Sequence, residues 1–185
     1  MAAAVSILTL PGWTNSGPGH WQSIWERAHP NCRRVEQENW DTPTRDDWLP
    51  TLDRAIAEAA PPIVLVAQSL GCHAAVEWAA RADLSRIARV AGAFLVAPPD
   101  LERKDAGRII RQWRPVLMRP LPFPSVLVAS RTDPYAPFER SQQFAAAWGS
   151  AFLDIGDAGH ITTASGYGPW PEGHALLQEF IARVT

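Results

Sequence analysis

Residues 63–80 read IVLVAQSLGCHAAVEWAA, and this stretch joins two apolar patterns at a single serine. The first part is a continuous apolar run, which is typical of a strand buried on both faces of a parallel sheet. The part after Ser69 has the periodicity of a helix. Small residues, Ala67 and Gly71, stand two positions to either side of the serine. The arrangement predicts a nucleophile elbow, a sharp strand-to-helix turn that exposes Ser69 for reaction.

The elbow departs from its common pattern at one position. The usual form is G-x-S-x-G, and here Ala67 occupies the first small position. A methyl group is the smallest change from glycine and is compatible with a close passage of strand and helix. The alternative is that Ser69 only caps the following helix, as serine often does at helix N-termini.

The composition is that of one globular domain. The chain has 185 residues, of which 46% are hydrophobic and 19% are charged, with a formal net charge of −2. We therefore predict a single domain over residues 1–185. No basic face is evident, which argues against a nucleic-acid partner. No apolar run approaches the ~20 residues of a membrane span, so no membrane association is expected.

The start of the chain and the cysteines bear on the compartment. The N-terminal apolar run contains no Lys or Arg and is interpreted as a first strand rather than a signal peptide. Cys32 and Cys72 are too few and too far apart for a disulfide framework or a zinc site. A reducing cytoplasm is therefore the expected location.

Strand and helix patterns alternate along the chain. Short apolar runs bounded by turn residues predict strands over 5–10, 63–67, 90–96, 125–129 and 151–155, with a weaker candidate over 33–37. Helical patterns lie in 19–30, 42–60, 69–81, 137–148 and 171–184, and Pro50 is expected in the first turn of its helix. Such alternation predicts an α/β fold in three layers, with helices on both faces of a mostly parallel six-stranded sheet in the order 2-1-3-4-5-6.

A serine hydroxyl is a weak nucleophile and needs a base within hydrogen-bond reach. Sites in open parallel sheets form beyond the carboxyl ends of the strands, so residues that directly follow strands are the candidates. His160 lies in a Gly-rich loop between the last predicted strand and the last predicted helix, and we predict that it is the general base. The other histidines flank or lie within helices: His20 and His29, expected at surface or helix-terminal positions, and His73 and His174.

The base in turn needs a carboxylate that fixes its tautomer and stabilises the imidazolium. Asp133 directly follows the fifth predicted strand, in a loop that two prolines would stiffen. Asp157, close to His160 in the sequence, and Asp100, after the fourth strand, are competitors. Ser69, Asp133 and His160 follow one another in the nucleophile–acid–base order of α/β-hydrolases.

Two backbone N–H groups normally hold the negative charge that develops on the carbonyl oxygen of an acyl substrate. We predict that these are the N–H groups of Leu70, after the nucleophile, and of Trp13, in the loop after the first strand. That loop lacks the lysine of a P-loop and the spacing of a dinucleotide-binding motif; the alternative is a connector without a catalytic part. Trp13 and Trp170 are predicted to bind substrate as walls of an acyl pocket, the alternative being ordinary loop packing.

Residues 98–124 form a long Pro-rich segment that interrupts the alternation of strands and helices. One short helix is expected in it, over 106–113. This segment is the one candidate to cover the site, and it is too short for a lid domain. It carries five arginines, which favour a solvated surface over an apolar cover: Arg103, Arg108, Arg111, Arg114 and Arg119. The sequence therefore predicts a minimal cap and a shallow pocket suited to short acyl groups.

Four stretches of the chain carry a resemblance to a known family: PGWTNSGPGHWQSIWE, DDWLPTLDRAIAEAAPPIVLVAQSLGCHAAVEWA, SRTDPYAPFERS and GDAGHITTASGYGPWPEG. Together they span nearly the whole length. The sequence resembles the small serine hydrolases of the α/β-hydrolase superfamily that include the YdeN-type proteins and the retinoblastoma-binding serine hydrolase. This resemblance implies a compact α/β-hydrolase with little or no cap, and it implies the triad roles of Ser69, Asp133 and His160.

The favoured interpretation is an esterase-like serine hydrolase that cleaves small acyl esters through an acyl-enzyme, without a metal or an organic cofactor. Its expected partner is a small acyl substrate, and the sequence gives no indication of a protein partner. The main alternative is a binding protein on a hydrolase scaffold, in which turnover is incidental. A flavodoxin-like cofactor protein is a third hypothesis, which a colourless purified sample would exclude.

Overall fold

The structure, a computed structural model, describes residues 5–185. Within this range six strands form one parallel sheet: β1 (Ser6–Leu10), β2 (Cys32–Arg34), β3 (Ile63–Gln68), β4 (Val90–Val96), β5 (Ser125–Ala129) and β6 (Ala151–Asp154). Their order across the sheet is β2-β1-β3-β4-β5-β6. The predicted fold class and strand order are confirmed.

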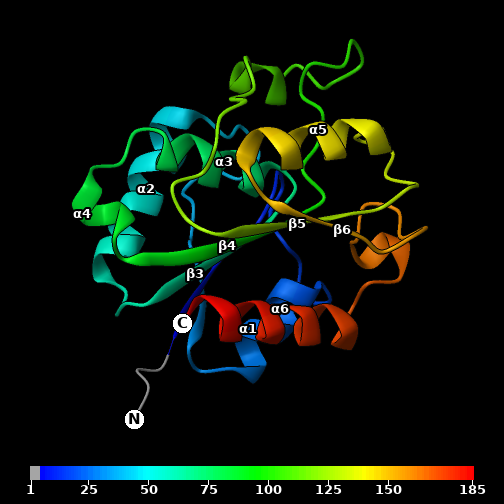
Figure 1. Ribbon diagram of the computed structural model, residues 1–185. Coiled ribbons are helices and arrows are strands. Elements are labelled where there is room, and N and C mark those ends of the chain that lie inside the picture. The colour runs from blue at the N-terminus through cyan, green and yellow to red at the C-terminus, as the bar shows by residue number, and fades with distance from the viewer. Residues whose placement is uncertain (1–4) are drawn as a thin grey trace.

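Helices cover both faces of the sheet (Figure 1). One face carries α1 (Trp21–Ala28) and α6 (Pro171–Val184), and the other carries α2 (Arg45–Glu58), α3 (Leu70–Ala79) and α5 (Phe138–Trp148). Three short elements complete the described fold: α4 (Leu84–Ile87), which was not predicted, and the 3-10 turns η1 (Ile110–Trp113) and η2 (Thr163–Ser165). None of the helices in residues 5–185 combines the length and the apolar composition of a membrane span.

Two apolar clusters fill the spaces between the layers. Leu65 and Phe144 belong to the cluster between the sheet and the layer of α2, α3 and α5. Val64 and Phe94 belong to the cluster beneath α1 and α6. Consecutive residues of a strand point to opposite faces, which places Val64 and Leu65 in different clusters. All six residues of β3 are buried, as expected for a central strand covered on both sides.

Two local predictions were wrong at the start of the chain. The strand predicted over 33–37 spans Cys32–Arg34, because β1 ends one residue beyond the Thr9–Arg34 pair and leaves later residues without a partner strand. The helix α2 begins at Arg45, so Pro50 lies in its second turn rather than its first. Pro50 is exposed, so water can reach the carbonyl group that its missing N–H leaves free.

The segment between β4 and β5 also differs from the prediction. A helix was expected over 106–113, and only the 3-10 turn η1 forms. The Arg111 side chain donates to the carbonyl groups of Lys104 and Ala106, and the Ala106 carbonyl is one that a helix over 106–113 would need for its own N–H groups. The indole N–H of the buried Trp113 donates to the carbonyl of Pro43 at 2.9 Å, which holds the segment against the body of the fold.

Candidate active site

The turn between β3 and α3 is a strained elbow at Ser69. This residue has φ 54° and ψ −125°, a region that residues other than glycine rarely adopt. Strain of this kind is the local signature of a nucleophile elbow, which lifts the side chain away from the strand and the helix. The Ser69 side chain does not cap α3, and the alternative reading as a simple cap is not supported.

The residue two positions after the serine has to be glycine because α3 starts against the end of β1. A Cβ atom at Gly71 would lie 2.1 Å from the carbonyl oxygen of Leu10 and 2.8 Å from that of Pro11. On the other side of the serine, Ala67 is fully buried, so its methyl group is accommodated where the common motif has glycine. The single departure from the elbow pattern therefore leaves the turn intact.

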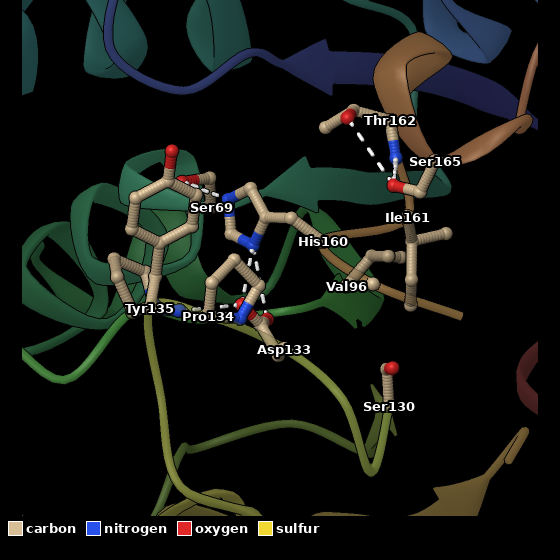
Figure 2. A network of polar contacts seen from close by, with 12 residues as sticks. Ser69, Val96, Ser130, Asp133, Pro134, Tyr135, His160, Ile161, Thr162 and Ser165 are labelled. Atoms are coloured by element: carbon tan, nitrogen blue, oxygen red, sulfur yellow. Dashed lines mark hydrogen bonds and ion pairs between the residues drawn. The ribbon is translucent and has the colours of Figure 1, made fainter. Parts of the chain in front are cut away.

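Side chains from three strand ends meet at this elbow (Figure 2). The Nε2 atom of His160 lies 2.9 Å from Oγ of Ser69, and Nδ1 lies 2.9 and 3.0 Å from the two carboxylate oxygens of Asp133. A carboxylate can only accept, so Nδ1 carries the proton and Nε2 accepts from the Ser69 hydroxyl. The structure brings these three predicted residues together.

Asp133 is the carboxylate that reaches the histidine. Its side chain is 2% exposed, and its Oδ1 also accepts the backbone N–H of Tyr135 at 2.9 Å. The two competitors lie elsewhere: Asp100 forms an ion pair with Arg140 at 3.3 Å, and Asp157 is exposed. A buried carboxylate with these donors is well placed to orient an imidazole and to stabilise its protonated form.

The loop that carries His160 is held by hydrogen bonds to neighbouring segments. The N–H groups of Ala158 and Gly159 donate to side-chain hydroxyls of the loop after β5, at 2.9 and 3.1 Å. The side-chain amide of Gln68, the residue before the nucleophile, donates to the carbonyl of His160 at 3.3 Å. Gln68 thus links the nucleophile turn directly to the loop of the histidine.

The loop after β1 passes directly beside Ser69. A Cβ atom at Gly12 would lie 2.7 Å from Cβ and 3.2 Å from Oγ of the serine. Among residues 5–185, the N–H groups of Trp13 and Leu70 donate to no protein acceptor. An oxyanion hole requires two free N–H groups close to the nucleophile, and the assignment of this role to Trp13 and Leu70 stays a prediction.

Two exposed aromatic side chains stand at the edge of the site. The Trp13 ring is 38% exposed, faces Gly107, and its indole N–H donates to the carbonyl of Asp41 at 2.9 Å. The Tyr135 ring packs edge-on against the His160 ring, with centroids 4.5 Å apart. Sequence reasoning missed Tyr135, although its position two residues after Asp133 at a strand end was a usable signal.

The structure does not bring Trp170 to the site. Its ring is 5% exposed and packs against the rings of Trp21 and Trp25, with centroids 5.3 and 5.9 Å apart. Trp170 precedes α6 with φ 43°, a left-handed turn that goes with its position among the aromatic rings of α1. A ring enclosed in this way has no free face for a substrate, and the structure gives its predicted pocket role no support.

An ion pair that the sequence did not reveal supports the loop after β1. The Arg34 guanidinium pairs with Glu26 at 2.9 Å and donates to Oδ1 of Asn15 at 2.9 Å and to the carbonyl of Ser16 at 3.1 Å. Thr14 and Asn15 have φ values of 67° and 68°, so this part of the loop is strained and depends on outside contacts. Arg34 therefore stabilises the loop that contains the Trp13 N–H.

His20 is the N-cap of α1, a helix-terminal position as expected, but it lies inside the protein rather than at its surface. It is 6% exposed, and its Nδ1 accepts the N–H of Gln22 at 3.2 Å at the start of α1. Burial, then the charge of Arg34 and then His160 lower the pKa of His20 to about 4. His20 is therefore neutral near pH 7 and adds no positive charge beside the His160 loop.

The arrangement contains the groups that acyl transfer needs. A serine hydroxyl is hydrogen-bonded to an imidazole, a buried carboxylate orients that imidazole, and the N–H groups of Trp13 and Leu70 have no protein acceptor within residues 5–185. In the part of the chain that the structure describes, no group of three or more His, Cys, Asp or Glu side chains is placed to hold a metal ion. The chemistry that this geometry supports is nucleophilic attack by Ser69.

Comparisons with known proteins identify the family and the fold. A family model described as "Serine hydrolase" matches residues 7–179. A YdeN-like hydrolase from Pectobacterium atrosepticum is 32% identical, with a TM-score of 0.85 over 97% of this chain and 92% of that chain. The ydeN gene product of B. subtilis is 19% identical (TM-score 0.78; 97% and 100% covered) and esterase 2 of Thermogutta terrifontis is 16% identical (TM-score 0.61; 97% and 83% covered), and both are similar in fold. No curated protein sequence matches the chain.

Proposed function

This chain belongs to the serine hydrolase family, and on that premise we propose that it hydrolyses small acyl esters through a triad of Ser69, His160 and Asp133. The observation that carries the proposal is the position of one imidazole ring. Its Nε2 lies 2.9 Å from the Ser69 hydroxyl, and its Nδ1 lies 2.9 Å from the Asp133 carboxylate. This geometry suits a general base that is fixed in one tautomer.

In the proposed reaction, Ser69 Oγ attacks the acyl carbon while His160 takes the hydroxyl proton. The imidazolium, stabilised by Asp133, then donates that proton to the leaving alcohol, and an acyl-serine ester remains. A water molecule, deprotonated by His160, cleaves this ester, and the proton returns to Ser69. The N–H groups of Trp13 and Leu70 hold the oxyanion in both steps.

We propose short acyl groups as substrates. The segment over residues 98–124 forms one short 3-10 turn among turns and bends, and its large apolar side chains Trp113 and Phe123 are buried in the core rather than free to cover a substrate. The exposed rings of Trp13 and Tyr135 are the proposed walls of the acyl pocket, and Tyr135 has the role that the sequence assigned to Trp170.

A reducing cytoplasm remains the proposed location. The free cysteines Cys32 and Cys72 are both buried, which is compatible with such a compartment.

The test is labelling of the purified protein by a fluorophosphonate probe, together with hydrolysis of p-nitrophenyl esters. We expect the wild type to label and to turn over, and Ser69→Ala to do neither while keeping its fold by circular dichroism. A folded wild type that is not labelled and does not hydrolyse any ester would favour the binding-protein alternative.

A further inference from the structure

The residue after His160 has a strained backbone. Ile161 has φ 53°, and its side chain is fully buried. For a β-branched residue this left-handed conformation is a genuine outlier. Such a residue keeps its conformation only where the surrounding contacts hold it. The contacts of Ile161 therefore bear directly on the placement of His160.

Both backbone polar groups of Ile161 are hydrogen-bonded. Its N–H donates to the carbonyl of Ala158 at 3.1 Å, which closes a tight turn around His160. Its carbonyl accepts the indole N–H of Trp21 at 2.9 Å, across 140 residues of sequence. Within residues 5–185 that indole is the one partner of this carbonyl. Trp21 is fully buried at the first position of α1.

The placement of His160 leaves little tolerance. Its ring has to lie within hydrogen-bond distance of Ser69 and of Asp133 at the same time, at 2.9 Å from each. Figure 2 shows Ile161 continuing from His160 on the side away from Tyr135. A relaxation of Ile161 to negative φ would turn the peptide that joins it to His160, and it would move the ring relative to both partners.

We propose that Trp21 is a positioning residue for the general base, because its indole N–H holds the carbonyl of Ile161 and so fixes the strained backbone beside His160. This inference rests on the proposed function. Without the indole N–H, the Ile161 carbonyl is buried and unpaired, and the strain at Ile161 favours a different backbone. The chemical step then slows, whereas substrate binding at the exposed edge of the site is little affected.

The primary test compares Trp21→Phe with Trp25→Phe. Trp25 is the matched control, since it is also buried in α1 and its indole N–H also donates to a backbone carbonyl, that of Pro169 at 3.0 Å. For p-nitrophenyl acetate, we expect Trp21→Phe to lower kcat by about ten- to a hundredfold with KM within about twofold. We expect the same loss in the rate of fluorophosphonate labelling, and near wild-type values for Trp25→Phe.

A rescue experiment separates positioning from general support of the fold. Glycine adopts positive φ without strain, so adding Ile161→Gly to Trp21→Phe should restore much of kcat, although it removes a buried side chain. A purely structural role of Trp21 predicts the opposite, because the second substitution destabilises the fold further. If Trp21→Phe does not fold, replacement of Trp21 by 3-benzothienylalanine removes the N–H and keeps the bicyclic ring.

Three outcomes would overturn the inference. Equal kcat in the Trp21 and Trp25 variants would show that the Ile161 hydrogen bond does not position the base. A Trp21→Phe/Ile161→Gly double variant no faster than Trp21→Phe would remove the role of backbone strain. A wild type that the probe does not label would overturn the proposed function, and this inference with it.

Discussion

Replacement of Gly12 by alanine adds one methyl group directly beside the nucleophile. The new Cβ would lie 2.7 Å from Cβ and 3.2 Å from Oγ of Ser69, far inside the ~3.5–4.0 Å at which carbon atoms attract. Ser69 has little freedom to move away, because its backbone is fixed at φ 54° and its N–H donates to the carbonyl of Val96 at 2.9 Å. The displacement therefore falls on the loop after β1, which contains the N–H of Trp13.

The size of the clash sets the size of the effect. Restoring normal contact requires a shift of about 1 Å, which removes the Trp13 N–H from its place beside the oxyanion. Loss of one oxyanion donor lowers kcat by about 10²–10³-fold in a serine hydrolase. Overpacking costs about 1–3 kcal/mol of stability, which lowers Tm by about 2–12 °C in a domain of this size. We expect a folded protein that has lost most of its activity.

The assay is kcat/KM on p-nitrophenyl acetate, with Tm as the measure of folding. Gly17→Ala is the matched control, because it lies in the same loop and no atom lies within 4 Å of its added Cβ. We expect the control to keep wild-type activity. A Gly12→Ala variant with kcat/KM within about threefold of Gly17→Ala would refute the argument that this backbone supplies an oxyanion donor.

Three further predictions follow from the site and the buried histidines. Ser69→Ala, His160→Ala and Asp133→Asn should each lower kcat by about a thousandfold or more, with double variants little worse than the singles, and multiplicative losses would contradict their action as one unit. A series of p-nitrophenyl esters from acetate to decanoate should reach its highest kcat/KM at or below about six carbons, at a gain of up to ~0.8 kcal/mol per methylene; a rise that continues through decanoate would exclude a short acyl site. Burial is the main cause that lowers the pKa of both His20 and His73 to about 4, so the unfolded chain binds more protons below pH 6.5 and stability falls on acidification. Urea titrations should give a free energy of unfolding about 2 kcal/mol lower per histidine at pH 5 than at pH 7, and a value independent of pH would contradict this.

The strand order and the meeting of three polar side chains could be predicted because both follow from local pattern and topology. Apolar runs such as β3 are long enough to be recognised as buried strands. Parallel strands then direct all their carboxyl ends to one edge of the sheet, where Ser69, Asp133 and His160 each follow a strand. The glycine at position 71 follows from the same local argument, since only the crossing of helix and strand demands it.

Burial of polar and aromatic side chains was the part that the sequence did not reveal. Arginine and histidine are residue types that usually lie at the surface. Only the packing of α1 against β1 and β2 encloses Arg34 and His20 together with Glu26. Trp170 stands between a Gly-rich loop and a proline, which suggested an exposed loop residue. Its neighbours across the fold, Trp21 and Trp25, lie about 150 residues earlier in the chain and decide its position.

The sharp turn at Ser69 was predicted from the elbow pattern, whereas the strained backbone at Ile161 was not, because the residue preferences of isoleucine argue against it. Ser69 and Ile161 both have positive φ, and neither residue type favours that region. Each is held by contacts with elements distant in sequence, and α1 contacts both the loop of His160 and the strand before Ser69. Trp21 bonds the loop of the base, and the side chain of Gln22 donates to the carbonyl of Val66 in the strand before the nucleophile, at 3.1 Å. The first turn of α1 therefore holds both the strand before Ser69 and the loop of His160, two parts of the site that lie 91 residues apart. We expect substitutions in this turn to change the distance between Ser69 and His160, because they displace one of these segments relative to the other.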